Sequence, residues 1–145
     1  NGMRSSFLTT GKHLSFTGQV MIFGIGIDII EIERIKHSIQ KYSERFEQKV
    51  FTQREIDYCR SQADPNKHFA ARFSVKEAVL KSFGTGMTGG IAWKDIEVGH
   101  QRSGQPVLNL YGKGKKLFDH LKLKTIHISI THDKQYAAAQ AIAEK

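Results

Sequence analysis

Two carboxylates and one lysine are the residues of this chain best suited to phosphate chemistry. Glu77 and Lys81 are four residues apart in a segment with helical spacing of apolar residues, so they are neighbours on one helix face. Asp28 lies in the apolar run 22–30, where an ionised carboxylate is normally paired, hydrogen-bonded or bound to a metal. Mg²⁺ is typically held by one or two carboxylates, with water and phosphate oxygens completing its shell. We therefore expect Asp28 and Glu77 to hold Mg²⁺ beside a phosphate, with Lys81 available to neutralise that phosphate.

Each of these residues also has a simpler interpretation. Glu77 and Lys81 would form a surface ion pair on any exposed helix, with a contribution of a few tenths of a kcal/mol. Asp28 would cap the helix that follows if the strand ended at that residue. The residues alone leave both alternatives open.

The carboxylates are expected on a central helix and an adjacent strand. The segment from Phe69 onward has an apolar surface wide enough for a largely buried helix, which Gly84 and Gly86 end, and residues 63–67 break the chain before it. The run 22–30 has the pattern of a buried strand. Its glycines, Gly24 and Gly26, are typical of close approach by a ligand or another backbone.

Two more helices are predicted between this strand and the central helix. An amphipathic helix from Glu31 to Phe46 aligns three basic residues along one edge of its apolar stripe, either as a solvated face or as a docking strip for an acidic partner; they are Arg34, Lys41 and Arg45. A second helix, Thr52 to Gln62, begins with the capping box of Thr52 and Glu55.

The chain beyond Gly86 is predicted to form strands and one short helix. Trp93–Val98 and Pro106–Tyr111 are candidate strands, residues 112–121 a short helix, and 125–131 with 136–143 a final hairpin. His132 follows the first strand of that hairpin, where ligand-contacting residues are common. The predicted fold is therefore α+β, with a small antiparallel sheet packed on helices.

Composition restricts the possible classes of protein. The 145 residues are enough for one domain with its own core, and the single cysteine excludes a disulfide framework and is typical of a reducing cytoplasm. Residues 1–20 are polar and without a stable period, so we interpret them as an extension, with Met21 as the native start and a single domain over 21–145. The apolar runs are too short to span a membrane.

The net charge of +8 favours an anionic partner. One alternative is therefore a basic nucleic-acid-binding module without catalysis. The chain has no recognised nucleic-acid-binding motif, and buried carboxylates repel phosphate unless a metal intervenes. We therefore expect no nucleic-acid partner. A dinucleotide-binding fingerprint at Gly24 is also disfavoured, because Ile29 takes the place of the third glycine.

Several motifs, taken in order, resemble those of one family. They are Gly24-Ile25-Gly26-Ile27-Asp28 with Glu31 and Arg34, then Phe69-Ala70-Ala71-Arg72-Phe73-Ser74-Val75-Lys76-Glu77-Ala78, Lys81, Gly84-Thr85-Gly86, and finally Ile128-Ser129-Ile130-Thr131-His132. From Met21 to about Glu144 the chain is similar to the holo-acyl-carrier-protein synthases, which are bacterial-type 4′-phosphopantetheinyl transferases. The resemblance is weakest between the central helix and the last hairpin.

The resemblance implies a cytoplasmic enzyme of fatty acid biosynthesis. It implies Mg²⁺-dependent transfer of 4′-phosphopantetheine from coenzyme A to a serine of acyl carrier protein, with release of adenosine 3′,5′-bisphosphate, by a homotrimer with active sites between subunits. The catalytic residues would be Asp28, Glu77 and Lys81, with Glu77, Asp28 or a water activated by them as the base. The coenzyme A contacts would be Arg72, Lys76, Lys81, Gly84, Thr131 and His132, and the carrier-protein contacts Arg34, Lys41 and Arg45.

Overall fold

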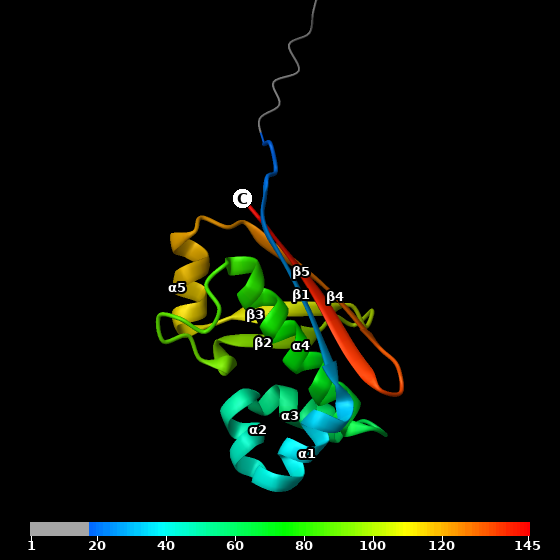
Figure 1. The fold of residues 1–145 in the computed structure, drawn as a ribbon. Helices are drawn as coiled ribbons and strands as arrows, with labels where there is room; N and C mark the ends of the chain where they lie inside the picture. The colour runs from blue at the N-terminus through cyan, green and yellow to red at the C-terminus, as the bar shows by residue number, and fades with distance from the viewer. Residues whose placement is uncertain (1–17) are drawn as a thin grey trace, which may run out of the picture.

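The structure, a computed structural model, describes residues 18–145 and has the predicted α+β class (Figure 1). The predicted extension, residues 1–20, lies outside the described residues apart from its last three. In chain order the elements are β1 (Ile22–Glu31), α1 (Ile32–Tyr42), α2 (Glu44–Val50), α3 (Gln53–Arg60), α4 (Pro65–Phe83), the 3₁₀ turn η1 (Trp93–Asp95), β2 (Ile96–His100), β3 (Pro106–Leu110), α5 (Gly112–His120), β4 (Thr125–His132) and β5 (Tyr136–Glu144).

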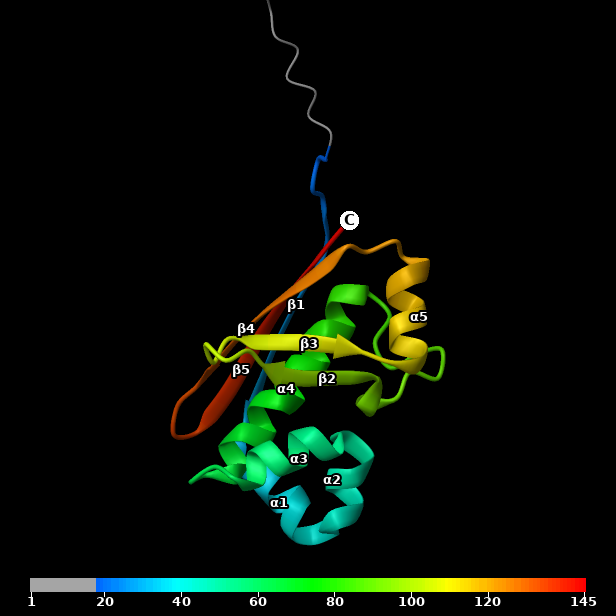
Figure 2. The ribbon, with the colours of Figure 1, turned by 180° about the vertical axis from the view of Figure 1, so that it is seen from behind.

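The central helix α4 lies between two small antiparallel sheets. Strands β1, β5 and β4 form one sheet in that order, and β2 pairs with β3 in the other. α4 packs against β1 and β5 and also contacts β2 and α3, while α1, α2 and α3 gather at the end where α4 begins (Figures 1 and 2). No helix in the described range is long and apolar enough to cross a membrane.

Strand β1 lies against the backbone of α4 because two of its residues have no side chain. A Cβ atom at Gly24 would overlap the carbonyl oxygen of Ser82, and one at Gly26 would overlap that of Ala78. The predicted close approach at these glycines is therefore an approach of strand to helix. Asp28 is two residues beyond Gly26, so it lies on the same, helix-facing side of β1.

The predicted buried strand, β1, is buried on only one face within the single chain. Ile25, Ile27 and Ile29 are 56%, 66% and 66% exposed, while Gly26 and Ile30 on the opposite face are buried. β1 is an edge strand of its sheet, and only one of its faces packs on α4. The chain therefore presents a row of isoleucines on the outer face of a sheet edge.

The prediction of one helix from Glu31 to Phe46 is also wrong. α1 ends at Tyr42, and Ser43, with a φ of 48°, turns the chain into the separate helix α2. The break allows Phe46 and Val50 on α2 to pack in the same apolar cluster as the buried isoleucines of α1. A chain that folds back in this way buries more apolar surface than one straight helix would.

Other boundaries differ less. The central helix begins at Pro65 rather than near Phe69, because Pro65 takes the first helical position and the Asp64 carboxylate accepts a hydrogen bond from the Lys67 N–H. Gly84, with a φ of 76°, ends α4 as predicted. The predicted strand at Trp93 begins only at Ile96, after η1. The capping box of Thr52 and Glu55 is confirmed at the start of α3.

Candidate active site

Lys81 joins α4 to β1 through the carboxylate of Asp28. Its Nζ atom donates hydrogen bonds to Asp28 Oδ1 at 3.0 Å and to the carbonyl oxygen of Ile27 at 2.8 Å. The ion pair of Lys81 is thus with Asp28 and not with Glu77 on its own helix. Asp28 does not cap the next helix, because α1 begins only after Glu31. Both of the simpler interpretations of these residues are therefore wrong.

Glu77 lies close enough to these two groups for their charges to act on it. Partial burial and the neighbouring Asp28 carboxylate raise the pKa of Glu77, and the Lys81 ammonium opposes that rise. Two carboxylates and one lysine carry a net negative charge when all three groups are ionised. The predicted set of Asp28, Glu77 and Lys81 is therefore brought together by the packing of β1 on α4.

The carboxylate oxygens of Asp28 and Glu77 suit a hard cation that also binds water and phosphate oxygens. In the part of the chain that the structure describes, no three His, Cys, Asp or Glu side chains gather as a metal cage. Two carboxylates are what Mg²⁺ commonly takes from a protein when water and phosphate oxygens supply the rest of its octahedron. Burial and then the Asp28 charge raise the pKa of Glu77, so a bound cation would favour its ionised form. Asp28 and Glu77 therefore fit Mg²⁺, and they fit an all-protein metal site poorly.

A second group of predicted residues lines a cleft of about 580 Å³. Arg72 comes from α4, and Thr131 and His132 come from the end of β4. The remaining residues of the lining are Tyr58, His68, Ala71, His100, Gly104, Gln105, Pro106, Ile128, Ser129 and Ile130. The guanidinium of Arg72 gives this cleft a permanent positive charge, which favours an anionic ligand.

Arg72 is buried in the wall of this cleft without a carboxylate partner among the described residues. Its guanidinium lies over the ring of Tyr58, 4.1 Å from the centroid, and its Nη2 atom is 3.3 Å from Nδ1 of His100. Its Nε atom is buried and has no hydrogen-bond partner in the described structure. A buried cation with an unused donor is costly unless a ligand or water satisfies it.

Besides Lys81, two of the predicted coenzyme A contacts lie outside this cleft. Lys76 is fully buried and donates to Glu55 Oε1 at 2.7 Å and to the carbonyl oxygens of Trp93 and Ile96. These three bonds use every donor of the ammonium group. The assignment of Lys76 as a phosphate contact is therefore wrong, and the residue is half of a buried ion pair. Gly84 lies just after the C-terminal end of α4 and is exposed there.

The predicted basic strip does not lie on one helix. Arg34 and Lys41 are exposed on α1, whereas Arg45 is exposed on α2, beyond the turn at Ser43. The prediction that all three share one helix edge assumed a continuous helix. It is wrong, because the chain turns at Ser43 between Lys41 and Arg45. Their exposure keeps all three available to a partner.

Three residues of the cleft with aromatic rings have no role predicted from the sequence. Tyr58, His68 and His100 come from α3, α4 and β2, and no local motif connects them. His68 is one helical turn before Arg72. That spacing is the only feature of the sequence that relates one of these three residues to the cleft. The rings of His68 and His132 lie 5.8 Å apart, centroid to centroid.

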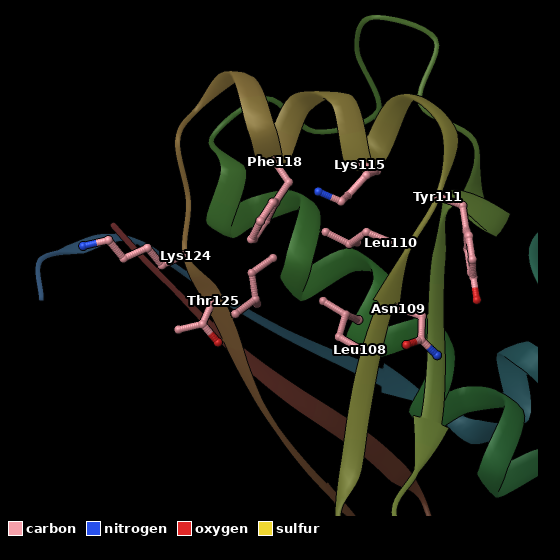
Figure 3. Close-up of a pocket in the computed structure, with 9 residues that line it drawn as sticks. Leu108, Asn109, Leu110, Tyr111, Lys115, Phe118, Lys124 and Thr125 are labelled. Carbon is pink, nitrogen blue, oxygen red and sulfur yellow. The ribbon is translucent and has the colours of Figure 1, made fainter.

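Another cleft, of about 370 Å³, lies between β3, α5 and the start of β4. Figure 3 shows Leu108 and Leu110 of β3 pointing toward the same space as Lys115 and Phe118 of α5. None of the residues predicted to act in catalysis or binding lines this cleft. It is therefore separate from the two groups described above.

Comparison with a family model and with curated relatives agrees over most of the chain. The model described as the 4′-phosphopantetheinyl transferase superfamily matches residues 24–141. A holo-[acyl-carrier-protein] synthase of Koribacter versatilis is 45% identical over 124 residues, which is 86% of this chain and 99% of that protein. A protein of the same name from Syntrophus aciditrophicus is 44% identical, over 86% of this chain and 97% of its own length.

Solved structures with the same fold include proteins of that name. The holo-[acyl-carrier-protein] synthase of Neisseria meningitidis superposes with a TM-score of 0.81 at 29% identity, covering 86% of this chain and all of that one. A holo-(acyl-carrier-protein) synthase from Bacillus anthracis, solved in complex with CoA (3′,5′-ADP), gives a TM-score of 0.72 at 33% identity, covering 86% of this chain and 98% of that one.

Proposed function

The chain belongs to the 4′-phosphopantetheinyl transferase superfamily, and from this premise we propose that it transfers 4′-phosphopantetheine from coenzyme A to a serine of apo acyl carrier protein, for fatty acid biosynthesis. The serine oxygen forms a bond to the phosphorus of phosphopantetheine, and the bond from that phosphorus to the rest of the pyrophosphate breaks. Adenosine 3′,5′-bisphosphate leaves. The observation that carries the proposal is the group formed by Asp28, Glu77 and Lys81 where β1 packs on α4.

We assign Mg²⁺ to the carboxylates of Asp28 and Glu77. Bound there, it would neutralise charge on the pyrophosphate, which is the main requirement of phosphoryl transfer. Lys81, half exposed at 51%, can turn its ammonium toward the leaving phosphate. Glu77, Asp28 or a water activated by them would accept the serine proton.

We assign the cleft at Arg72 to the far end of coenzyme A. Arg72 and Lys81 are nine residues apart on α4, which is about 180° around the helix axis and about 13.5 Å along it. One chain therefore presents the reacting group on one side of α4 and the anion cleft on the other. The reacting pyrophosphate belongs beside Lys81, so the phosphate left for Arg72, Thr131 and His132 is the 3′-phosphate of coenzyme A.

Two groups on opposite sides of one helix favour a site shared between copies of the chain. We propose a homotrimer in which the pyrophosphate group of one subunit faces the Arg72 cleft of the next. The exposed isoleucines Ile25, Ile27 and Ile29 are the surface that such packing would bury. A row of large apolar residues along a sheet edge is unfavourable in water and is typical of an interface.

We propose that the acidic carrier protein docks on the exposed basic residues of α1 and α2. Arg34 and Lys41 lie on α1, and Arg45 follows across the turn at Ser43. Complementary charge raises the rate of association and fixes the approach of the partner. It contributes less to the binding of coenzyme A, because the phosphates of coenzyme A are assigned to other cationic residues, Lys81 and Arg72.

Product analysis tests the proposed reaction. The protein is incubated with coenzyme A, Mg²⁺ and apo acyl carrier protein, and adenosine 3′,5′-bisphosphate is measured by chromatography. We expect its release to require both the carrier and the metal, and to stop when a chelator is added. Release that continues without the carrier would indicate hydrolysis of coenzyme A and would contradict the proposal.

A further inference from the structure

Three side chains from three elements form one stacked unit in the wall of the anion cleft. The ring of His100, at the end of β2, stacks on the ring of Tyr58 from α3, with centroids 4.4 Å apart and an interplanar angle of 22°. The guanidinium of Arg72 lies over the same tyrosine ring at 4.1 Å. His100 is thus fixed by the stack on Tyr58 and touches Arg72 at its edge.

The contact between His100 and Arg72 has a defined direction. A guanidinium only donates hydrogen bonds, so in the 3.3 Å contact between Nη2 of Arg72 and Nδ1 of His100 the histidine nitrogen must accept. The acceptor is the neutral ring with its proton on Nε2. Burial, and then the charge of Arg72, lower the pKa of His100 and so favour that neutral form.

This contact leaves Arg72 oriented but unsatisfied. Nη2 has His100 as its partner, one face of the guanidinium has Tyr58, and the buried Nε has no partner in the described structure. Arg72 is only 2% exposed, so its side chain has little freedom to find other partners. An anion in the cleft therefore meets a guanidinium whose orientation is set by its neighbours.

We propose that His100, held by its stack on Tyr58, is a positioning residue that orients the Arg72 guanidinium toward the 3′-phosphate and thereby sets the preference of the enzyme for coenzyme A over 3′-dephospho-coenzyme A. The inference rests on the proposed function, because it assumes that the cleft binds this substrate. It adds a residue that acts through Arg72 rather than on the reacting phosphate.

The test compares two substrates that differ only in the 3′-phosphate. Transfer to apo acyl carrier protein is measured with coenzyme A and with 3′-dephospho-coenzyme A. In H100F a ring still stacks on Tyr58 but the acceptor is lost, whereas H100N keeps an acceptor close to the position of Nδ1. A hydrogen bond to a charged group contributes about 1.5–3 kcal/mol, so H100F should raise KM for coenzyme A by roughly tenfold or more.

The expected pattern separates positioning from a general structural effect. In H100F, kcat for coenzyme A stays near that of the wild type, KM for 3′-dephospho-coenzyme A hardly changes, and H100N restores most of the preference. In R72Q the preference is lost, and the double variant R72Q/H100F is no worse than R72Q, because a residue that acts through Arg72 has no effect without it.

Three results would overturn the inference: an unchanged preference in H100F, an equal rise in KM for both substrates, or additive effects of R72Q and H100F. Each of these, with an active wild-type protein, leaves the proposed function intact. A wild-type protein that modifies the carrier with neither substrate would contradict the proposed function and this inference together.

Discussion

The ammonium group of Lys81 lies between the Asp28 carboxylate and the carbonyl oxygen of Ile27, 3.0 Å from the first and 2.8 Å from the second. One lysine on α4 thus contacts a side chain and the backbone of the neighbouring strand. The contact is possible because Gly24 and Gly26 let β1 lie directly on α4. The strand that carries one carboxylate is in this way placed over the helix that carries the other.

Replacing Lys81 separates a chemical role from a structural one. Its side chain is 51% exposed, so the ion pair with Asp28 is screened by water, and K81Q should cost less than about 1 kcal/mol in the free energy of unfolding. If Lys81 neutralises the leaving phosphate, kcat should fall by at least about 100-fold. Urea unfolding and steady-state kinetics measure the two effects, and wild-type kinetics in K81Q would show that Lys81 has no chemical role.

The raised pKa of Glu77 predicts how the stability of the metal-free protein depends on pH. A carboxyl group with a higher pKa in the folded than in the unfolded protein binds protons more tightly when folded. Its contribution is therefore full at low pH and declines as pH rises through the folded-state pKa. E77Q cannot ionise, so it should raise the Tm at pH 7.5, relative to the wild type, more than it does at pH 4.

Thermal unfolding in a chelating buffer at these two pH values measures this difference. Added Mg²⁺ should remove the advantage of E77Q at pH 7.5, because the wild type gains a ligand for its ionised carboxylates that the variant binds poorly. A Tm change in E77Q that is the same at both pH values would indicate that Glu77 is not in the charged environment described above.

The buried pair of Lys76 and Glu55 is expected to act in stability and not in substrate binding. Burial lowers the pKa of Lys76, and the Glu55 carboxylate opposes this effect. Removing one partner leaves a buried charge uncompensated, so K76M should cost about 3–5 kcal/mol. The matched control K94M, at an exposed position, should cost little.

Kinetics of the folded fraction of K76M complete that test. Below its unfolding transition, KM for coenzyme A should stay close to the wild-type value. A large rise in KM without loss of stability would restore Lys76 as a substrate contact.

Several parts of the site could be predicted from the sequence because their signals are local. The pattern of Glu77 and Lys81 follows from helical spacing, and Asp28 stands out as a charge in an apolar run. Helical spacing does not distinguish Lys76 from Glu77 and Lys81 on the same helix, because the partner of Lys76, Glu55, is 21 residues away. Local periodicity gives no information about such a distant pair.

The cleft could not be assembled from the sequence for the same reason. Tyr58, Arg72 and His100 meet only because α3, α4 and β2 pack together. The break at Ser43 and the exposed face of β1 also depend on packing: the apolar pattern of 22–30 is the same whether the second face meets a helix, another subunit or water. Composition and periodicity predict that a face is apolar without identifying what covers it.

A charge placed on the isoleucine face tests whether other copies of the chain cover it. I27K should have little effect on the folding of one chain, because Ile27 is 66% exposed there. It should reduce a species with the mass of three chains to a single chain, with loss of activity, because the proposed sites lie between subunits. Light scattering after size-exclusion chromatography measures the mass.

The control for I27K is M87K, at an exposed methionine outside the sheet. M87K should keep the mass and activity of the wild type. A wild-type protein that is active as a single chain, or an I27K variant that keeps the mass of three chains, would contradict the proposed assembly.

The most direct measurement is the intact mass of apo acyl carrier protein after incubation with coenzyme A and Mg²⁺, using the wild-type protein and the D28N variant in parallel. We expect the wild type to add one phosphopantetheine group to the carrier, and D28N, although folded, to add almost none in the same time. A carrier left unmodified by the wild type, while a known holo-[acyl-carrier-protein] synthase modifies the same sample, would contradict the assigned reaction. A D28N variant as fast as the wild type would contradict the role of Asp28.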